Sequence, residues 1–126
     1  MAAVGVVLDT TVFVDILRRV PQARDFVKAL SDPPVASEVT RAEVIRGLRS
    51  SERGVAEGLF ETVTWIGVTE TVAFEAGELG RRYRRSHSGL SIADLVVAAT
   101  ALRAGLPLAT SNTKHFPMFK GLKAPY

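Results

Sequence analysis

The sequence predicts an α/β fold, a three-layer α/β/α sandwich built on a short, mostly parallel sheet of four to five strands. Short apolar runs of the kind found in buried parallel strands alternate with longer helical segments along the chain. Such alternation favours parallel pairing through right-handed crossovers, which place helices on both faces of a sheet. At 126 residues, the chain is expected to form a single domain over residues 1–126.

The expected strands are short apolar runs bounded by polar residues or turns. They cover residues 4–8, 35–36, 63–68 and 106–109, and a weak edge strand is expected over residues 122–124. Asp9 ends the first run, Pro33 and Pro34 precede the second, and Trp65 and Ile66 form the centre of the third. Continuous rather than alternating apolar residues indicate strands that are covered on both faces.

The expected helices show apolar residues at helical spacing and recognisable ends. They cover residues 12–19, 21–30, 37–49 and 51–62, then a stretch capped by Thr69 or Thr71 that runs to about residue 86, and finally residues 91–105. Pro21 suits a first helical turn, and Gly105 suits the position just after the last helix. Gly54 and Gly58 weaken the fourth helix by roughly 1 kcal/mol each relative to Ala.

The last of these helices, SIADLVVAATALRAG, is apolar almost all round and should be buried. Asp94 stands in its first turn on the same face as Val97 and Ala101, so the carboxylate is expected to face inward and to need a partner. Taken alone, Ser91 and Asp94 fit a capping box, and a negative charge in the first turn also suits the helix dipole. Only other acids brought to the same place would favour a functional role.

The composition limits the chemistry that the chain can perform. It contains no cysteine, which excludes disulfides, thiolate zinc sites and cysteine nucleophiles and is compatible with a reducing cytoplasm. His87 and His115 are the only histidines, so any metal should be a hard, oxygen-bound ion such as Mg²⁺ or Mn²⁺. The 16 Lys and Arg residues against 13 Asp and Glu give a net charge of +3, which permits an anionic partner.

Targeting and membrane-spanning segments are not expected. The first apolar run ends at Asp9 and has no basic segment before it, unlike a signal peptide. The longest apolar run elsewhere, residues 95–99, is far shorter than the about 20 residues of a membrane span. These features predict a cytoplasmic protein without a membrane partner.

Four polar residues are expected to meet at one edge of the sheet. In open parallel sheets, ligands bind beyond the carboxyl ends of the strands, where the strand order reverses. Asp9 directly follows the first strand, Glu43 lies in the helix after the second, Asp94 begins the helix that leads into the fourth, and Asn112 follows the fourth. Three carboxylates in one cleft repel one another unless a cation neutralises them, so the set predicts a metal site.

Each of these residues also has a purely structural interpretation. Asp9 could cap the first helix. Thr40 and Glu43 have the spacing of a capping box. Asn112 suits a turn, because Asn tolerates left-handed conformations and bonds its own backbone. The combination, rather than any residue alone, favours a site.

The ligand type points to phosphodiester hydrolysis. Mg²⁺ and Mn²⁺ held by carboxylates keep waters and bind phosphate oxygens of a substrate. Such an ion lowers the pKa of a bound water and offsets the charge that builds up on a phosphodiester. No histidine base is required, which fits a chain so poor in this residue.

Basic residues near the expected site could bind a nucleic acid. Four arginines and an aromatic residue immediately precede the Asp94 helix, where they could follow a phosphate backbone. They are Arg81, Arg82, Tyr83, Arg84 and Arg85. The alternative is a solvated helix face with the tyrosine turned inward. Lys114 and His115, near Asn112, could also contact phosphate or simply lie on the surface.

Three segments of the sequence resemble a known family. VVLDTTVFVDIL, TRAEVIRGL and SIADLVVAATALRAGLPLATSNTKHF are similar, in this order, to the motifs of PIN-domain ribonucleases, and within these to VapC toxins of type II toxin–antitoxin systems. The resemblance covers the whole chain. It implies an Mg²⁺- or Mn²⁺-dependent endoribonuclease that acts as a toxin.

The resemblance also assigns roles to individual residues. It places Asp9, Glu43 and Asp94 at the acidic metal-binding positions of the family. Thr10 stands where a small hydroxyl residue follows the first acid, and is expected to contact substrate. Asn112 replaces a fourth acid that many PIN domains carry, so one well-held ion is the expectation. The family further implies a homodimer and a VapB-like antitoxin whose C-terminal segment wraps the toxin.

Two other classes of function remain open from the residues alone. A phosphate-handling, receiver-like domain or an aspartyl-phosphate enzyme would carry further acids beside Asp9, but Thr10 and Thr11 stand there. A PIN-like module that binds RNA with little or no cleavage would keep the basic residues and would not need the acids.

Overall fold

The computed structural model describes residues 5–126 and contains one parallel sheet. Its strands are β1 (Val7–Leu8), β2 (Val35–Ser37), β3 (Thr64–Ile66) and β4 (Leu108–Ala109). They lie in the order β3-β2-β1-β4, and all three neighbouring pairs run parallel. The chain moves outward from β1 to β3 and then returns to place β4 on the other side of β1. The strand order therefore reverses between β1 and β4, which is where an open α/β sheet binds its ligand.

Six α-helices and two short 3₁₀ helices complete the described part of the chain. They are α1 (Thr10–Leu17), α2 (Pro21–Lys28), α3 (Glu38–Arg46), η1 (Ser50–Glu52), α4 (Arg53–Glu61), α5 (Glu70–Tyr83), α6 (Ile92–Ala104) and η2 (Thr113–His115). No helix among residues 5–126 is long and apolar enough to cross a membrane.

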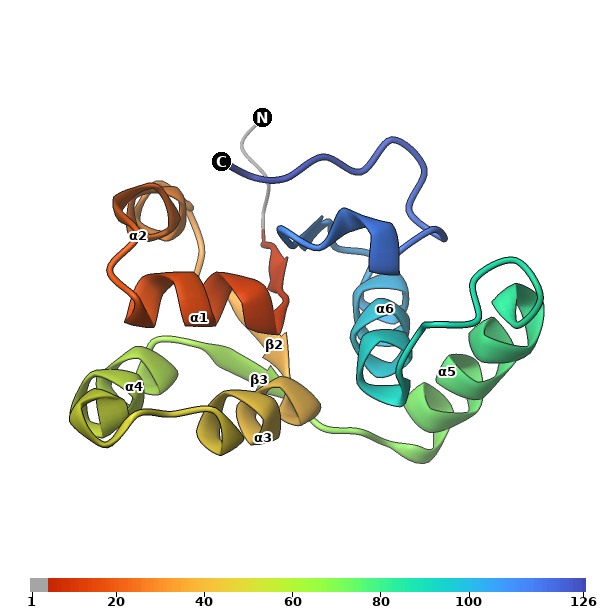
Figure 1. Cartoon of the computed structure of the whole chain (residues 1–126), viewed down its shortest axis with the longest axis horizontal. Helices are drawn as coiled ribbons and strands as arrows, with labels where there is room; N and C mark the ends of the chain where they lie inside the picture. Colours follow the sequence, from red (N-terminus) through yellow and green to blue (C-terminus); the bar gives the residue numbers. More distant parts are fainter. Residues whose placement is uncertain (1–4) are drawn as a thin grey trace.

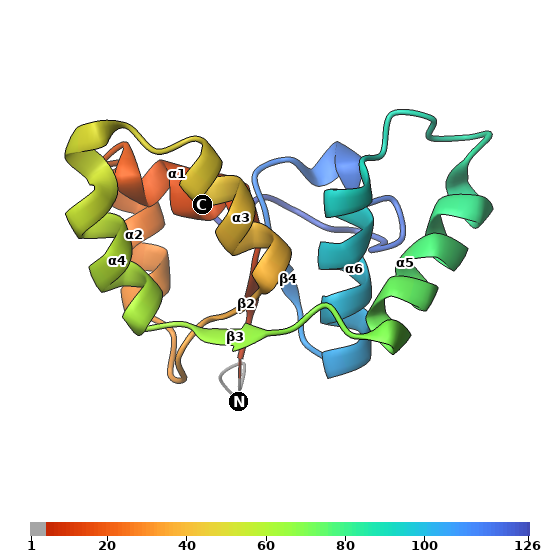
Figure 2. The ribbon, with the colours of Figure 1, turned by 90° about the horizontal axis from the view of Figure 1, so that it is seen from below.

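The helices cover both faces of the sheet, so the predicted α/β/α sandwich is confirmed. Figures 1 and 2 show α1, α2 and α4 on one side of the strands and α5 and α6 on the other. Helix α3 contacts both α1 and α6 and so bridges the two sides beyond the end of β2. This position matters below, because Glu43 lies on α3.

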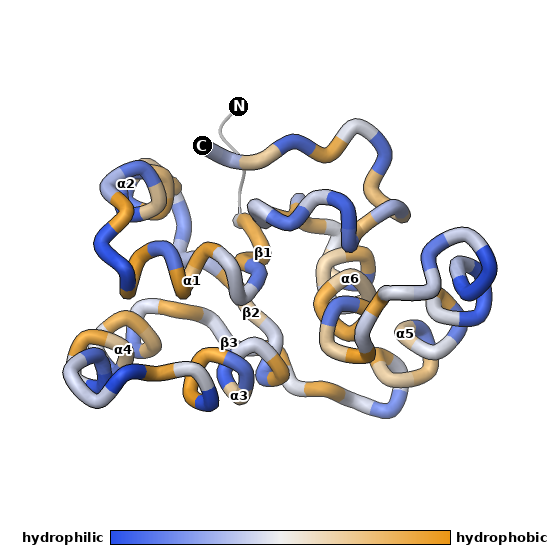
Figure 3. The backbone as a smooth tube through the Cα atoms, in the orientation of Figure 1, coloured by the Kyte–Doolittle hydropathy of each residue, from blue (hydrophilic) through white to orange (hydrophobic). Residues whose placement is uncertain are grey.

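Two hydrophobic clusters share the sheet between them. One joins α5 and α6 to Val7 and Leu108, and the other packs α1 and α4 against Leu8, Ala36 and Ala109. Figure 3 shows hydrophobic segments in β1 and α6 near the middle of the molecule and a hydrophilic stretch beyond α5. Adjacent residues of one strand thus enter different cores, which explains why the strands are continuously apolar.

Helix α6 begins and ends as its sequence predicts. Ser91 and Asp94 form a capping box in which each side chain bonds the other residue's backbone amide. Gly105 closes the helix with φ +66°, a left-handed conformation that glycine adopts without a Cβ clash. Seven consecutive residues, 95–101, are buried. The Asp94 side chain is therefore attached to one of the most firmly packed elements of the fold.

The other helices begin close to the expected residues. Pro21 occupies the first turn of α2, and Thr69 caps α5 by accepting a hydrogen bond from the amide of Val72 at 3.2 Å. Of the two candidate caps for α5, Thr69 is therefore the correct one. The first strand is shorter than the apolar run that predicts it, and Val4 lies outside the described residues.

One predicted strand is absent, and one structural alternative does not hold. Residues 122–124 form no strand, so the described sheet has four strands and no added edge. Helix α3 begins where the sequence predicts, capped by Ser37, whose hydroxyl accepts a bond from the amide of Val39, so Thr40 is not its cap. Ser37 is also the last residue of β2, so strand and helix meet without the loop that a cap at Thr40 would need.

Candidate active site

Asp9 lies at the switch point of the sheet and is only 4% exposed. Its amide donates to the carbonyl of Ala109 at 2.9 Å, which continues the pairing of β1 with β4. Asp9 occupies the cap position of α1, yet its side chain makes no capping bond. Instead Oδ2 accepts hydrogen bonds from Thr110 at 2.8 Å and from Thr11 at 3.0 Å. The interpretation of Asp9 as a simple helix cap is therefore wrong.

Glu43 projects from α3 and is exposed. Its Oε1 accepts a hydrogen bond from the hydroxyl of Thr10 at 2.6 Å. Because Thr10 directly follows Asp9, this bond places Glu43 beside the carboxyl end of β1. The proposed capping box with Thr40 does not form, and the Thr40 hydroxyl is fully buried without a hydrogen-bond partner among the residues described.

Asp94 has two kinds of partner. Within the capping box, its Oδ2 accepts from the amide of Ser91 at 3.3 Å. The same oxygen lies 3.0 Å from Nδ1 of His115, which belongs to η2 just beyond β4. The capping interpretation of Asp94 is confirmed, and the imidazole is an additional partner that capping does not require.

Asn112 does not take the turn conformation that its residue type suggests. Its φ is −101°, outside the left-handed region, and its side chain makes no capping bond to η2. Nδ2 lies 2.9 Å from Nδ1 of His115, and the Asn112 amide donates to the hydroxyl of Thr110 at 3.0 Å. Asn112 thereby joins the Asp9 side of the site to the Asp94 side.

The three carboxylates share a pattern of hydrogen bonding. In each, one oxygen accepts all the hydrogen bonds found within residues 5–126: Oδ2 of Asp9, Oε1 of Glu43 and Oδ2 of Asp94. The second oxygen of each accepts none there. The second oxygen of Asp9 is not among the buried side-chain atoms that lack a partner in residues 5–126, so it remains open to solvent or to a cation.

The carboxylates are nevertheless not gathered around one point. Within the described chain, no group of three or more His, Asp or Glu side chains is arranged to hold a metal ion. Hydrogen-bonded side chains, chiefly Thr110, Asn112 and His115, lie between Asp9 and Asp94. The donor chemistry fits a hard divalent cation, and the predicted metal set stays a prediction.

The predicted phosphate-binding residues all lie at the surface. Arg81, Arg82, Arg84, Arg85 and Lys114 are exposed. Arg81 lies 3.9 Å from Glu78, a contact between two exposed side chains that contributes little. Tyr83 is half-buried against the α5–α6 core. This arrangement is compatible with both the phosphate-binding and the solvated-face interpretation.

Comparison with known proteins identifies the family. The sequence model of the PIN domain matches residues 6–120. Ribonuclease VapC19 of Mycobacterium tuberculosis H37Rv is 43% identical over 122 residues, which cover 94% of this chain and 98% of that protein. This chain belongs to the VapC family of PIN-domain proteins. Ribonuclease VapC10 of the same strain is also 43% identical, over 96% of this chain and 92% of its own length.

Solved structures agree with the VapC assignment at the level of the fold. A toxin–antitoxin complex from Klebsiella pneumoniae matches with a TM-score of 0.82 and 24% identity, over 96% of this VapC-family chain and 98% of that chain. DNA-bound VapBC from Salmonella typhimurium matches with a TM-score of 0.81 and 20% identity, over 98% and 97%. The overall fold of this chain is thus shared with these solved proteins.

The contacts that Thr110, Thr11 and His115 make with the acids were not predicted from the sequence. Thr110 follows β4 and could have been found by the same strand-end rule that selects Asn112. Thr11 directly follows Thr10, and no sequence pattern indicates that it bonds Asp9. His115 is expected from the sequence only as a possible phosphate contact, because its contact with Asp94 depends on how η2 packs beside α6.

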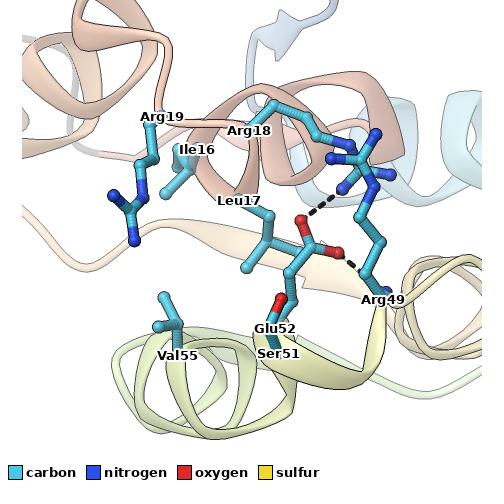
Figure 4. A pocket seen from close by; sticks show the side chains of 8 residues that line it. All are labelled: Ile16, Leu17, Arg18, Arg19, Arg49, Ser51, Glu52 and Val55. Carbon is cyan, nitrogen blue, oxygen red and sulfur yellow. Dashed lines mark hydrogen bonds and ion pairs between the residues drawn. The ribbon is translucent and has the colours of Figure 1, made fainter.

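A second polar cluster lies away from this site in the VapC-family chain. Glu52 is buried and bonds the amide of Arg49 at 2.8 Å and the guanidinium of Arg18 at 2.6 Å (Figure 4). The amide of Arg49, followed by the charge of Arg18, lowers the pKa of Glu52 against the opposing effect of burial. These residues line a cleft of about 310 Å³ that also includes Arg19, Ile16 and Val55.

Proposed function

We propose that this chain is the toxin of a type II toxin–antitoxin pair and cleaves RNA as a metal-dependent endoribonuclease. The observation that carries the proposal is the hydrogen bonding of the Asp9, Glu43 and Asp94 carboxylates. In each, the protein holds one oxygen, and the second accepts no hydrogen bond from the described residues. The names of the 43% identical relatives, ribonucleases VapC19 and VapC10, support RNA as the substrate.

We propose Mg²⁺ or Mn²⁺ as the cofactor, held by Asp9, Glu43 and Asp94. A bound ion would supply an activated water and a positive charge for the phosphodiester. The chain's own task is to hold the carboxylates ready. Thr110 and Thr11 fix one oxygen of Asp9, and Thr10 fixes one oxygen of Glu43, which directs the remaining oxygens to the cation.

We also propose which residues contact the RNA substrate. Asn112 lies among the acids and can contribute an amide to substrate or to a water. Arg81 and Arg82 lie in the last turn of α5, and Arg84 and Arg85 follow it. All four precede the helix that carries Asp94, and they could bind the phosphates of an RNA strand. Lys114 is exposed beside Asn112 and could bind a further phosphate.

The test is Mg²⁺-dependent cleavage of a labelled single-stranded RNA. Asp94→Asn should reduce cleavage to background, because the amide cannot offer a charged oxygen to the ion. Asp25→Asn, the same change at an exposed position on α2, is the matched control and should cleave normally. Unchanged cleavage by folded Asp94→Asn protein would contradict the proposal. RNA binding that survives EDTA without products would instead indicate a binding module.

We propose that the antitoxin lies in a groove between α1, α2 and α4. Three adjoining clefts there share Ile16, and the two larger ones have volumes of about 480 and 360 Å³. Their apolar lining includes Val27, Leu30 and Leu59, and Arg24 stands at two of them. An apolar segment that also carries acidic residues would fit such a groove. Two structural neighbours, the toxin–antitoxin complex from Klebsiella pneumoniae and VapBC from Salmonella typhimurium, support a partner of this kind.

The groove can be tested by placing a negative charge in its apolar lining. Val55 is 60% exposed, so Val55→Asp should fold normally and weaken binding of a co-expressed VapB-like antitoxin. Leu102→Asp, at a 47% exposed position on α6 across the sheet, is the control. Equal antitoxin binding by wild type and Val55→Asp would place the partner elsewhere.

Two further features follow from the family. We propose that two copies pair, in which case light scattering should report twice the 13.6 kDa chain mass, whereas a monomer at micromolar concentration would contradict pairing. We also propose that the protein acts in the cytoplasm, where its RNA substrate is found.

A further inference from the structure

His115 is the one side chain that contacts both Asp94 and Asn112 within the described chain. Its Nδ1 lies 3.0 Å from Oδ2 of Asp94 and 2.9 Å from Nδ2 of Asn112. The His115 side chain is 43% exposed, whereas that of Asp94 is 17% exposed. The imidazole therefore covers one oxygen of the carboxylate and presents its remaining edge to solvent.

The chemistry of the three groups decides which contact is the stronger hydrogen bond. An ionised carboxylate can only accept, and the nitrogen of an amide side chain can only donate. Nδ1 can donate to Asp94 or accept from Nδ2 of Asn112, but one ring nitrogen cannot do both. A bond to a charged acceptor is about twice as strong as one between neutral groups, so Nδ1–H donates to Asp94.

We propose that His115 is a positioning residue, which orients the Asp94 carboxylate so that its second oxygen binds the catalytic metal ion. This inference rests on the proposed function. Without His115, the side chain of Asp94 keeps, among residues 5–126, only the capping bond from Ser91 at 3.3 Å, a distance beyond the usual range for N–H···O bonds. That bond alone leaves the carboxylate free to rotate about its terminal torsion, which is intrinsically broad.

The position of His115 in the fold suits this role. It lies on η2, which follows β4, whereas Asp94 lies in the first turn of α6, which precedes β4. The contact thus joins the start of α6 to the 3₁₀ helix η2 beyond β4, at the edge of the sheet where the candidate site lies. Hydrogen-bond partners that orient metal ligands in this way typically change metal affinity by about 10- to 100-fold when they are removed.

Three variants of His115 separate this role from its alternatives. The side-chain nitrogen of Asn superimposes on Nδ1 of histidine, and that of Gln superimposes on Nε2. His115→Asn should therefore retain the donor to Asp94, while His115→Gln and His115→Ala should lose it. If His115 acted instead on substrate through its exposed Nε2, Gln would restore function and Asn would not.

The readout is the affinity for Mn²⁺ alone, measured by electron paramagnetic resonance or calorimetry without RNA. His115→Ala and His115→Gln should weaken Mn²⁺ binding by about tenfold or more, and His115→Asn should stay close to wild type. Excess Mn²⁺ should restore cleavage by His115→Ala, because the ligand itself is intact. It should not restore cleavage by Asp94→Asn.

The controls keep the inference separate from the proposed function. His87→Ala removes the other histidine, which is exposed and bonds only to its neighbour Ser86 through its side chain, and should leave Mn²⁺ affinity unchanged. Loss of Mn²⁺ binding in Asp94→Asn together with unchanged affinity in all His115 variants would overturn the positioning role alone. Wild-type Mn²⁺ binding by Asp94→Asn would overturn the proposed function. If the Ala variant fails to fold, the comparison of Asn with Gln still decides.

Discussion

Replacing Thr110 by Val should destabilise the protein because it removes a hydroxyl that serves the buried Asp9 carboxylate. Thr110 is fully buried, donates to Asp9 at 2.8 Å and accepts from the amide of Asn112 at 3.0 Å. Val has nearly the same shape as Thr, so no cavity forms. Losing a hydrogen bond to a charged group costs about 1.5–3 kcal/mol, and the Asn112 amide also loses its acceptor. We expect a loss of about 2–3 kcal/mol in the free energy of unfolding.

Two other buried threonines, neither of which bonds a carboxylate, provide matched controls. Thr100 donates to the carbonyl of Val96 four residues earlier in α6, a bond that adds little because that carbonyl already belongs to the helix. Thr40 is fully buried and its hydroxyl has no partner within residues 5–126. Thr100→Val should change stability by less than about 0.5 kcal/mol, and Thr40→Val should stabilise the protein by about 1 kcal/mol.

Urea unfolding in the presence of EDTA gives the free energy of unfolding of all three variants. The chain has a single tryptophan, Trp65, which stacks on Phe13 in the core and should report unfolding by its fluorescence. The slope of free energy against urea should be the same for each, because the surface exposed on unfolding is unchanged. Equal losses for Thr110→Val and Thr100→Val would refute the idea that Thr110 supports a buried charge.

Two titratable groups predict how stability depends on pH. The Arg49 amide and the Arg18 guanidinium lower the pKa of Glu52 from its usual 4.5, so its contribution to stability is present above pH 4.5 and is lost as the pH falls through the lower folded-state value. Urea unfolding at acidic pH should therefore show Glu52→Gln to be less acid-sensitive than wild type, and identical profiles would contradict this. Burial, and then the hydrogen bond to Asp15, raise the pKa of Tyr126 above 10, so its contribution is present below pH 10 and is lost as the pH rises further. Thermal unfolding at alkaline pH should show a smaller loss of stability in Tyr126→Phe than in wild type, and a larger one would argue against the contact.

The parts of the fold that the sequence predicts best are those with local signals. Helix α6 is predicted from its buried face, its capping box and Gly105, all of which lie within the helix or next to it. The start of α3 is also predicted correctly, because Ser37 is a good helix cap and the expected helix begins there. The spacing of Thr40 and Glu43 also fits a capping box that does not form, since a short pattern cannot separate two candidate caps three residues apart.

The C-terminal segment shows why the expected edge strand does not form. Tyr126 donates to Asp15 and its ring stacks on Phe26 with the centroids 6.1 Å apart. Leu122 donates its amide to the nearby carbonyl of Phe119 rather than to a strand. Side-chain contacts with α1 and α2 hold this segment, and such distant contacts leave no periodic pattern in the sequence.

Some residues of the candidate site can likewise be predicted from the sequence, and others cannot. The strand-end rule selects Asp9 and Asn112 from the chain, and the structure places both at the switch point. The groups that hold them come from far away, since Thr110 and Asp9 are 101 residues apart. Likewise, His115 reaches Asp94 across 21 residues. Sequence patterns identify the charged groups, but the hydroxyls and the imidazole that orient them depend on the packing of η2 and β4.

Direct binding of Mn²⁺ to wild-type protein and to Asp9→Asn tests the central claim that the rim carboxylates hold a metal ion. Wild type should bind one Mn²⁺ ion per chain in the absence of RNA, and folded Asp9→Asn should lose that ion. The Asp25→Asn variant should bind as wild type does. No binding to wild type, or equal binding by wild type and Asp9→Asn, would contradict the account.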